Sequence, residues 1–131
     1  MEHPGEFKTE VPFTLPKGYL DSVGVLHRHG VMRLATAADE ILPLRDPRVQ
    51  QNEAYISVII LARVIVGLGD LPNVDTRVVE GLFASDFNYL QRLYEKLNSA
   101  DGGEDDGIQD SIAALDRASA AVRRFRTVGE A

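Results

Sequence analysis

The stretch Ala54–Leu68 reads A-Y-I-S-V-I-I-L-A-R-V-I-V-G-L and is the densest apolar run in the chain. It is too long for an ordinary strand, and it falls short of the roughly 20 residues that span a bilayer. As a helix it would carry apolar side chains in almost every direction, which is typical of a helix surrounded on most sides. Its Val and Ile content locally favours a strand, but its length favours a helix.

Signals on both sides of this run indicate where the helix begins and ends. Asp46 is a good N-cap, and Pro47 suits the first helical position because its missing N–H would be unpaired there in any case. Gly67, Gly69 and Pro72 supply a stop. We therefore predict one central helix from Pro47 to Gly67, on which the other segments pack.

The residues before this helix predict a hairpin and a short helix. Two apolar–polar alternations between residues 11 and 35 flank turn residues, which is typical of a small antiparallel hairpin or meander. Either residues 21–24 or the pair at 29–30 could form its turn. Thr36 predicts the start of a helix over residues 37–42, with Asp39 completing a shortened capping box.

Two more helices are expected after the central one. Asp75 predicts the start of a short helix that ends at Phe83, and Ser85 predicts the start of the next. The latter helix has one apolar face, made by Phe87, Leu90, Tyr94 and Leu97. The predicted fold class is therefore α+β, mainly α: an N-terminal β-hairpin packed on a four-helix body, with a separate C-terminal helix.

The chain divides into four parts by composition. Residues 1–10 indicate a flexible leader, and residues 11–98 a globular body of hairpin (11–35) and helices (37–98). Residues 99–107, S-A-D-G-G-E-D-D-G, predict a flexible acidic linker. Residues 108–131 predict an amphipathic helix whose apolar stripe is Ile108, Ile112, Leu115, Ala118, Val122 and Phe125. Such a helix is marginal alone, so it needs its own body, another copy or a different protein.

The composition indicates one soluble domain. The chain has 131 residues, 44% of them hydrophobic and 26% charged, with a net charge of −6 and no cysteine. No apolar signal segment stands at the N-terminus, so we expect a cytoplasmic protein. The body shows no basic face, so the sequence gives little support for nucleic-acid binding through neutralisation of phosphates.

No catalytic residue, metal site or cofactor is predicted, so the chain is expected not to be an enzyme. His27 and His29 would share a strand face, but a zinc site needs three or four ligands. Exposed hairpin histidines are the favoured interpretation. Helix capping explains the acidic pair at 39–40, and solvation of a linker explains the acids at 104–106. No serine has the G-x-S-x-G context of a nucleophile.

Arg63 is the most unusual charge, because it stands inside the apolar run. A buried unpaired charge is very costly, so we expect a carboxylate partner such as Glu40, Glu53 or Glu80. Arg63 is either an interface anchor or a side chain that reaches solvent from the helix edge. The candidate protein-interaction residues are Arg63, Ile108, Ile112, Leu115, Val122 and Phe125. Arg123, Arg124 and Arg126 are candidates for contact with an acidic partner or anionic headgroups.

Three stretches resemble a known family: F-T-L-P-K-G-Y-L-D (13–21), G-V-L-H-R-H-G-V-M-R-L-A-T-A-A-D-E-I (24–41) and R-V-Q-Q-N-E-A-Y-I-S-V-I-I-L-A-R-V-I (48–65). They resemble the small tail-assembly proteins of phage-like contractile systems, including the extracellular contractile injection systems of bacteria. Many tail-assembly chaperones carry a hairpin followed by L-R-x-L-T-x-x-D-E, which M-R-L-A-T-A-A-D-E (32–40) resembles here. The resemblance covers residues 12–98.

This resemblance implies a non-enzymatic assembly factor, a chaperone or adaptor. Such a protein would bind a tail, tube or tape-measure component of a contractile particle through apolar helical surfaces. It would form a homo-oligomer, bind no nucleic acid and need no cofactor. The alternative is a structural subunit of the particle itself, such as a collar, a cap or a membrane-facing component. The apolar run and the Arg-rich end leave peripheral membrane contact open.

Overall fold

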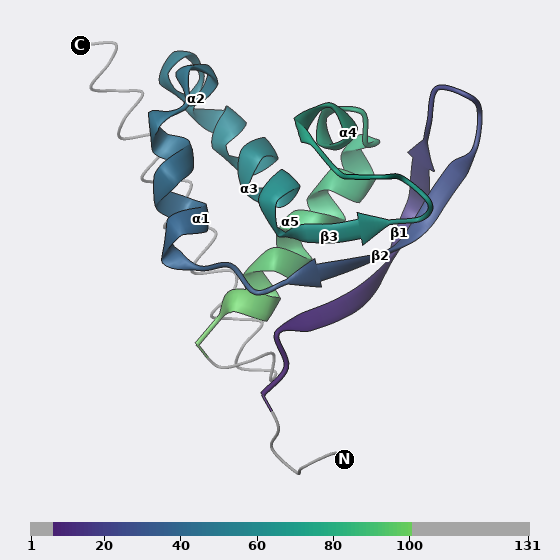
Figure 1. Ribbon diagram of the computed structural model, residues 1–131, viewed down its shortest axis with the longest axis horizontal. Helices are drawn as coiled ribbons and strands as arrows, with labels where there is room; N and C mark the ends of the chain where they lie inside the picture. Colours follow the sequence, from purple (N-terminus) through teal and green to yellow (C-terminus); the bar gives the residue numbers. More distant parts are fainter. Residues whose placement is uncertain (1–6, 101–131) are drawn as a thin grey trace.

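The structure, a computed structural model, describes residues 7–100 (Figure 1). Residues 1–6 of the predicted leader, and the linker and C-terminal helix from residue 101 onward, lie outside the described residues. The elements, with η for a 3-10 helix, are β1 (Glu10–Leu20), β2 (Leu26–Arg33), α1 (Ala37–Ile41), η1 (Leu42–Arg45), α2 (Pro47–Gln51), η2 (Glu53–Tyr55), α3 (Ile56–Val64), β3 (Ile65–Leu68), α4 (Thr76–Glu80) and α5 (Ala84–Asn98).

Strands β1 and β2 form the expected antiparallel hairpin, whose register pairs Val11 with Met32 and Leu20 with Leu26. Its turn is the first of the two predicted alternatives. The backbone N–H of Asp21 donates to the carbonyl of Val25 at 2.9 Å, and the Asp21 carboxylate accepts the N–H of Val25, also at 2.9 Å. The turn is therefore closed by an aspartate that bonds the residues following it.

The predicted single helix from Pro47 to Gly67 is wrong, and its first break is at Asn52. Asp46 and Pro47 do start a helix as expected, but α2 ends at Gln51. Asn52 has φ −147° and ψ 100°, an extended conformation that no helix continues through. Its side chain then accepts the N–H of Ala54 and starts the next turn. Asparagine favours this cap role over a helix interior because its short amide competes for backbone groups.

The second correction is at the other end of the run, where Ile65–Leu68 form strand β3. β3 pairs antiparallel with β2, so the sheet has the order β1-β2-β3. The predicted hairpin on a four-helix body is therefore wrong. The described residues form a three-stranded antiparallel sheet with five α-helices, most of them very short.

The edge of β2 explains why this segment extends. A two-stranded hairpin is marginal alone and gains from a third strand, and β-branched residues such as Ile65 and Val66 suit a pleated surface. Gly30 allows the close approach, because a Cβ atom there would lie 2.6 Å from the carbonyl oxygen of Gly67. Local strand preference therefore prevails over the length of the apolar run once β2 offers a partner.

Helix α3 is the part of the apolar run that occupies the predicted central position. It contacts α1, η1, α4, α5 and β3, while α5 lies across β1 (Figure 1). In this helix Ile60 is half-buried, and the fully buried position beside it is Leu61. The core is formed by residues from the three strands and from the helices, and its most buried members include Leu15, Met32, Leu61, Val64, Leu68 and Leu90.

Helix caps were predictable in three of four cases. Thr36, Asp46 and Asp75 each accept a backbone N–H at the start of a helix, as expected. The prediction for Ser85 is wrong: α5 begins at Ala84, and no side chain caps it. The apolar face predicted for α5 is correct, because Leu90 and Tyr94 are buried in the core.

Asp86, in the first turn of α5, bonds to strand β1. Its carboxylate is fully buried and accepts the backbone N–H of Lys17 at 3.0 Å and of Gly18 at 2.7 Å. These N–H groups lie where the β1–β2 register shifts and the ladder is interrupted. Buried backbone donors need a partner, and Asp86 supplies one from a helix 68 residues further along the chain.

Candidate functional site: the Asp39 cluster and the outer face of α1–η1

Asp39 is the residue on which the first helix is built. Thr36 caps α1: its hydroxyl accepts the Asp39 N–H, while the Asp39 carboxylate accepts the Thr36 N–H at 2.7 Å. This reciprocal capping box is the local role that the sequence predicts for Asp39. However, the Asp39 residue is only 2% exposed. A carboxylate buried to this degree needs more than capping bonds to remain stable.

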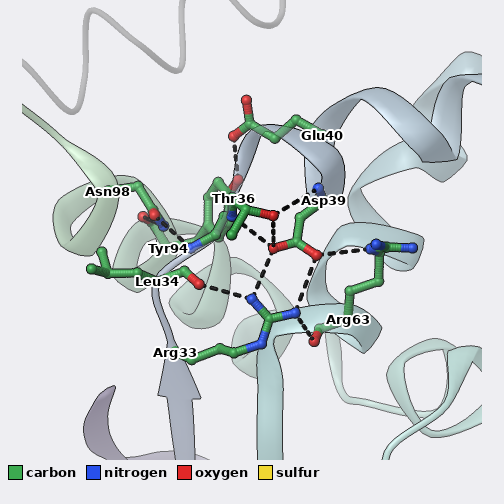
Figure 2. Close-up of polar contacts among 9 residues, drawn as sticks. Arg33, Leu34, Thr36, Asp39, Glu40, Arg63, Tyr94 and Asn98 are labelled. Atoms are coloured by element: carbon green, nitrogen blue, oxygen red, sulfur yellow. Dashed lines mark hydrogen bonds and ion pairs between the residues drawn. The ribbon is translucent and has the colours of Figure 1, made fainter. Parts of the chain in front are cut away.

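Two arginines from other elements donate further hydrogen bonds to the Asp39 carboxylate (Figure 2). Arg33, at the end of β2, donates two hydrogen bonds to the two carboxylate oxygens of Asp39, at 2.8 and 3.1 Å. Arg63, in α3, donates from Nε at 2.9 Å. Arginine forks suit this arrangement because their geometry matches a carboxylate. The Asp39 cluster is defined here as Arg33, Thr36, Asp39 and Arg63.

The cluster joins three elements at one point. Arg33 also donates to the carbonyl of Leu34 and to the carbonyl of Arg63, each at 2.9 Å. The second of these carbonyls lies near the end of α3, two residues before β3 begins. One guanidinium therefore ties the end of β2 to α1 and to the point where α3 becomes β3. Through this contact the cluster supports the strand that the sequence did not predict.

The surroundings of Asp39 fix its ionisation. The hydrogen bonds from Arg33 hold the pKa of Asp39 well below its ordinary value near 3.8, and those from Thr36 and Arg63 act in the same direction against the effect of burial. The same contact raises the pKa of Arg33. A carboxylate with both oxygens engaged and a lowered pKa is poorly suited to proton transfer near neutral pH. The cluster is therefore suited to holding structure.

The lowered pKa of Asp39 predicts a pH dependence of stability. The unfolded chain takes up a proton near pH 3.8, whereas the folded chain takes it up only at lower pH, so the contribution of Asp39 is present above this range and is lost as pH falls. The difference in unfolding free energy between wild type and Asp39→Asn should be constant above about pH 5 and shrink below about pH 4. Urea unfolding across this range measures it, and a difference that stays constant down to about pH 3 would contradict it.

A second group of contacts attaches α5 to the start of α1. The Tyr94 hydroxyl donates to the carboxylate of Glu40. Burial, and then this hydrogen bond, raise the pKa of Tyr94 above its ordinary value near 10. Asn98 accepts the Ala35 N–H at 2.9 Å and donates to the Tyr94 carbonyl at 2.8 Å. The C-terminal end of α5 is therefore held beside the residues that precede α1 (Figure 2).

The helices α1 and η1 present their polar and apolar residues in the reverse of the usual order. Asp39 and Pro43, four residues apart, are buried against the body. Ile41, Leu42 and Leu44 point outward and are 58%, 44% and 44% exposed. The informative departures from normal burial are a buried charge and an exposed apolar group, and this short segment shows both. The outer face of α1–η1 consists of Ala37, Ala38, Ile41, Leu42 and Leu44, all exposed.

No family model, curated protein or solved structure that was compared with this chain matches it. The resemblance described for residues 12–98 therefore rests on the sequence motifs alone. Those motifs include Arg33, Thr36 and Asp39, which the structure brings together in one cluster. In this chain, the most distinctive part of the motif accordingly has a structural use.

The candidate residues predicted from the sequence meet different outcomes. Arg63 has a carboxylate partner as expected, but it is Asp39 and not Glu40, Glu53 or Glu80. Its side chain is 36% exposed, so the guanidinium reaches solvent at the helix edge while staying paired. Its candidate role as an interface anchor stays a prediction. The tail candidates, from Ile108 to Arg126, lie outside the described residues.

The expectation that both hairpin histidines are exposed is wrong for His27. His29 is exposed, but His27 is 5% exposed and accepts the Asp70 N–H at 3.3 Å while bonding the Asp21 carboxylate at 2.8 Å. The accepted N–H assigns the tautomer that carries its proton on Nε2. Gly69 packs against this ring, with φ +55°, leaving no room for a side chain. His27 therefore fastens the hairpin turn to the loop after β3.

Within residues 7–100, no group of three or more His, Asp or Glu side chains has the arrangement of a metal site. In the same range, no helix combines the length and the apolar character needed to cross a membrane.

Proposed function

We propose that this chain is a non-enzymatic assembly factor that binds a component of a contractile, phage-tail-like particle. The outer face of α1–η1 carries this proposal, because the protein keeps a charge inside and three large apolar side chains outside on the same short segment. Contiguous exposed apolar groups mark binding surfaces. The motif resemblance supplies the class of partner: a tail, tube or tape-measure component.

The rigidity of this face supports a binding role. The capping box and the two arginines hold α1 from its inner side, and Gln50 donates to the carbonyl of Leu44 at 2.7 Å. A surface already held in its binding conformation loses less freedom when a partner docks. The Asp39 cluster therefore contributes to binding indirectly, by fixing the direction in which Ile41 and Leu44 point.

The size of the face indicates the strength of the contact. A standard protein interface uses about 20–30 residues on each side, and the outer face of α1–η1 offers five. A contact centred on it is weak or transient unless neighbouring elements contribute. An assembly factor that must release its client needs such a contact, whereas a permanent subunit needs a larger one.

A double substitution on this face should remove client binding without unfolding the body. In Ile41→Asp/Leu44→Asp, the lost apolar burial and the added charges should weaken binding at least tenfold. A tenfold loss of affinity corresponds to about 1.4 kcal/mol of binding free energy. The measurement is co-purification of the tagged chain with tube and tape-measure proteins co-expressed from the same particle. Circular dichroism checks that the helices remain.

Val23→Asp is the control, because Val23 is an apolar residue on the hairpin turn that is even more exposed, at 81%. It should leave co-purification unchanged. Binding that survives the double substitution, or that is lost in the control, would overturn the assignment of this face. Recovery of the chain at fixed stoichiometry in purified particles would favour the structural-subunit alternative.

A further inference from the structure

The outer face of α1–η1 has a candidate occupant within the chain itself. We propose that residues 108–126 dock on this face in cis, with Ile108, Ile112 and Leu115 against Ile41, Leu42 and Leu44. The proposal stands on where the described chain ends, on the length of the segment that follows, and on the match between two apolar surfaces.

The described chain ends beside the first residues of the face. The Asn98 side chain accepts the N–H of Ala35, at 2.9 Å, two residues before α1 begins. Tyr94, one turn earlier in α5, bonds Glu40 within α1. In Figure 1 the end of α5 accordingly lies beside the start of α1. The chain beyond residue 100 therefore continues from the end of the face that carries Ala37.

The linker is long enough to reach any part of the face. Residues 101–107 can span up to about 25 Å when extended. The face is shorter: five helical residues from Ala37 and the turn that follows cover about 14 Å. As the flexible linker that their composition predicts, residues 101–107 would give the attached segment a millimolar effective concentration. A weak apolar contact is therefore populated within one chain before a second copy can compete.

The two surfaces match in kind and in length. The sequence from 108 to 125 repeats apolar residues at steps of three and four, and about ten helical residues cover 14 Å. The five members of the outer face of α1–η1 are all apolar, and the exposed charges of the same segment are Glu40 and Arg45. The hairpin turn is also apolar, but it lies at the far end of β2, about 23 Å from Arg33. We therefore place residues 108–126 on the nearer surface, which is the outer face of α1–η1.

Docking would regulate the proposed function. If the client binds the same face, which rests on the function proposed above, then the client and residues 108–126 exclude each other. The chain would shield its apolar face until a client displaces the tail segment. The docking itself does not depend on the identity of the client, so the two proposals can fail separately.

A spin label on the tail segment tests docking in the full-length protein without any client. The chain has no cysteine, so Ala120→Cys provides one labelling site on the side opposite the apolar stripe. The label should broaden the amide NMR signals of residues 37–45 and leave those of residues 20–26 sharp. Adding Leu115→Asp should restore the signals of 37–45, whereas Ala113→Asp, on the opposite side, should not.

A mixed sample separates docking in cis from docking in trans. Isotope-labelled wild type is combined with unlabelled, spin-labelled protein, and cis docking predicts no broadening in this mixture. Broadening in the mixture at 37–45 would show docking on a second copy and overturn the cis proposal. Sharp signals at 37–45 in the singly labelled chain, or broadening that Leu115→Asp leaves unchanged, would overturn docking itself.

Discussion

Replacing Asp39 with asparagine is expected to lower the free energy of unfolding by roughly 3 kcal/mol, because it removes one partner of a buried ion-pair group. The carboxylate is 3% exposed and receives both arginines, so the variant leaves two guanidiniums facing a neutral amide. Their partial exposure, 33% and 36%, keeps the loss at the lower end of the range for buried pairs. Urea unfolding monitored by circular dichroism measures the change.

Asp46→Asn is the matched control for this prediction. Asp46 also starts a helix and pairs with an arginine, Arg48, but that side chain is 51% exposed. Asparagine caps a helix about as well as aspartate, so only the exposed ion pair is lost, at less than about 1 kcal/mol. Similar losses in both variants would show that the burial of Asp39 does not contribute to its effect.

Gly30→Ala is expected to lower the free energy of unfolding by roughly 2–3 kcal/mol, the upper part of the range for overpacking a filled site. The added methyl would lie 2.6 Å from the carbonyl oxygen of Gly67 and would also collide with the ring of Phe13. The first is a backbone atom of β3, so relief requires the two strands to separate. Amide hydrogen exchange at residues 65–68 should accelerate more than the global loss of stability explains.

Gly67→Ala tests the same strand pair from the other side. A Cβ atom at Gly67 meets nothing within 4 Å, so this variant should be neutral or slightly more stable than wild type. The comparison also tests the correction to the fold. If residues 47–67 formed one helix, β3 would not exist and Gly30→Ala would have no strand to displace. Equal behaviour of the two variants would contradict the β2–β3 pairing.

Local signals in the sequence predicted the features that depend on neighbouring residues. Thr36 and Asp75 cap helices because a short polar side chain can reach an N–H two or three residues ahead. The apolar spacing of Leu90 and Tyr94 placed one face of α5 against the core. These properties involve backbone groups within one helical turn, so the order of amino acids suffices to determine them.

The candidate site could not be predicted in the same way. Asp39 looks complete as a capping residue, and nothing in the sequence marks Arg63, 24 residues later, as its partner. The apolar residues Ile41, Leu42 and Leu44 look like core residues until the burial of Asp39 turns them outward. The one available signal was the closeness of Arg33, six residues before Asp39.

The sequence by itself determined the hairpin, most helix caps and the apolar face of α5, and it narrowed the hairpin turn to two alternatives. Only the tertiary structure decided that the run from Ala54 to Leu68 leaves the helix at its end and forms strand β3. The physical reason is that a β-strand owes its stability to hydrogen bonds with a partner strand, and β2 becomes adjacent only after the chain folds. The direction of α1 was decided in the same way, by Arg63 from α3 together with Arg33 from β2, which bind its aspartate from the inside.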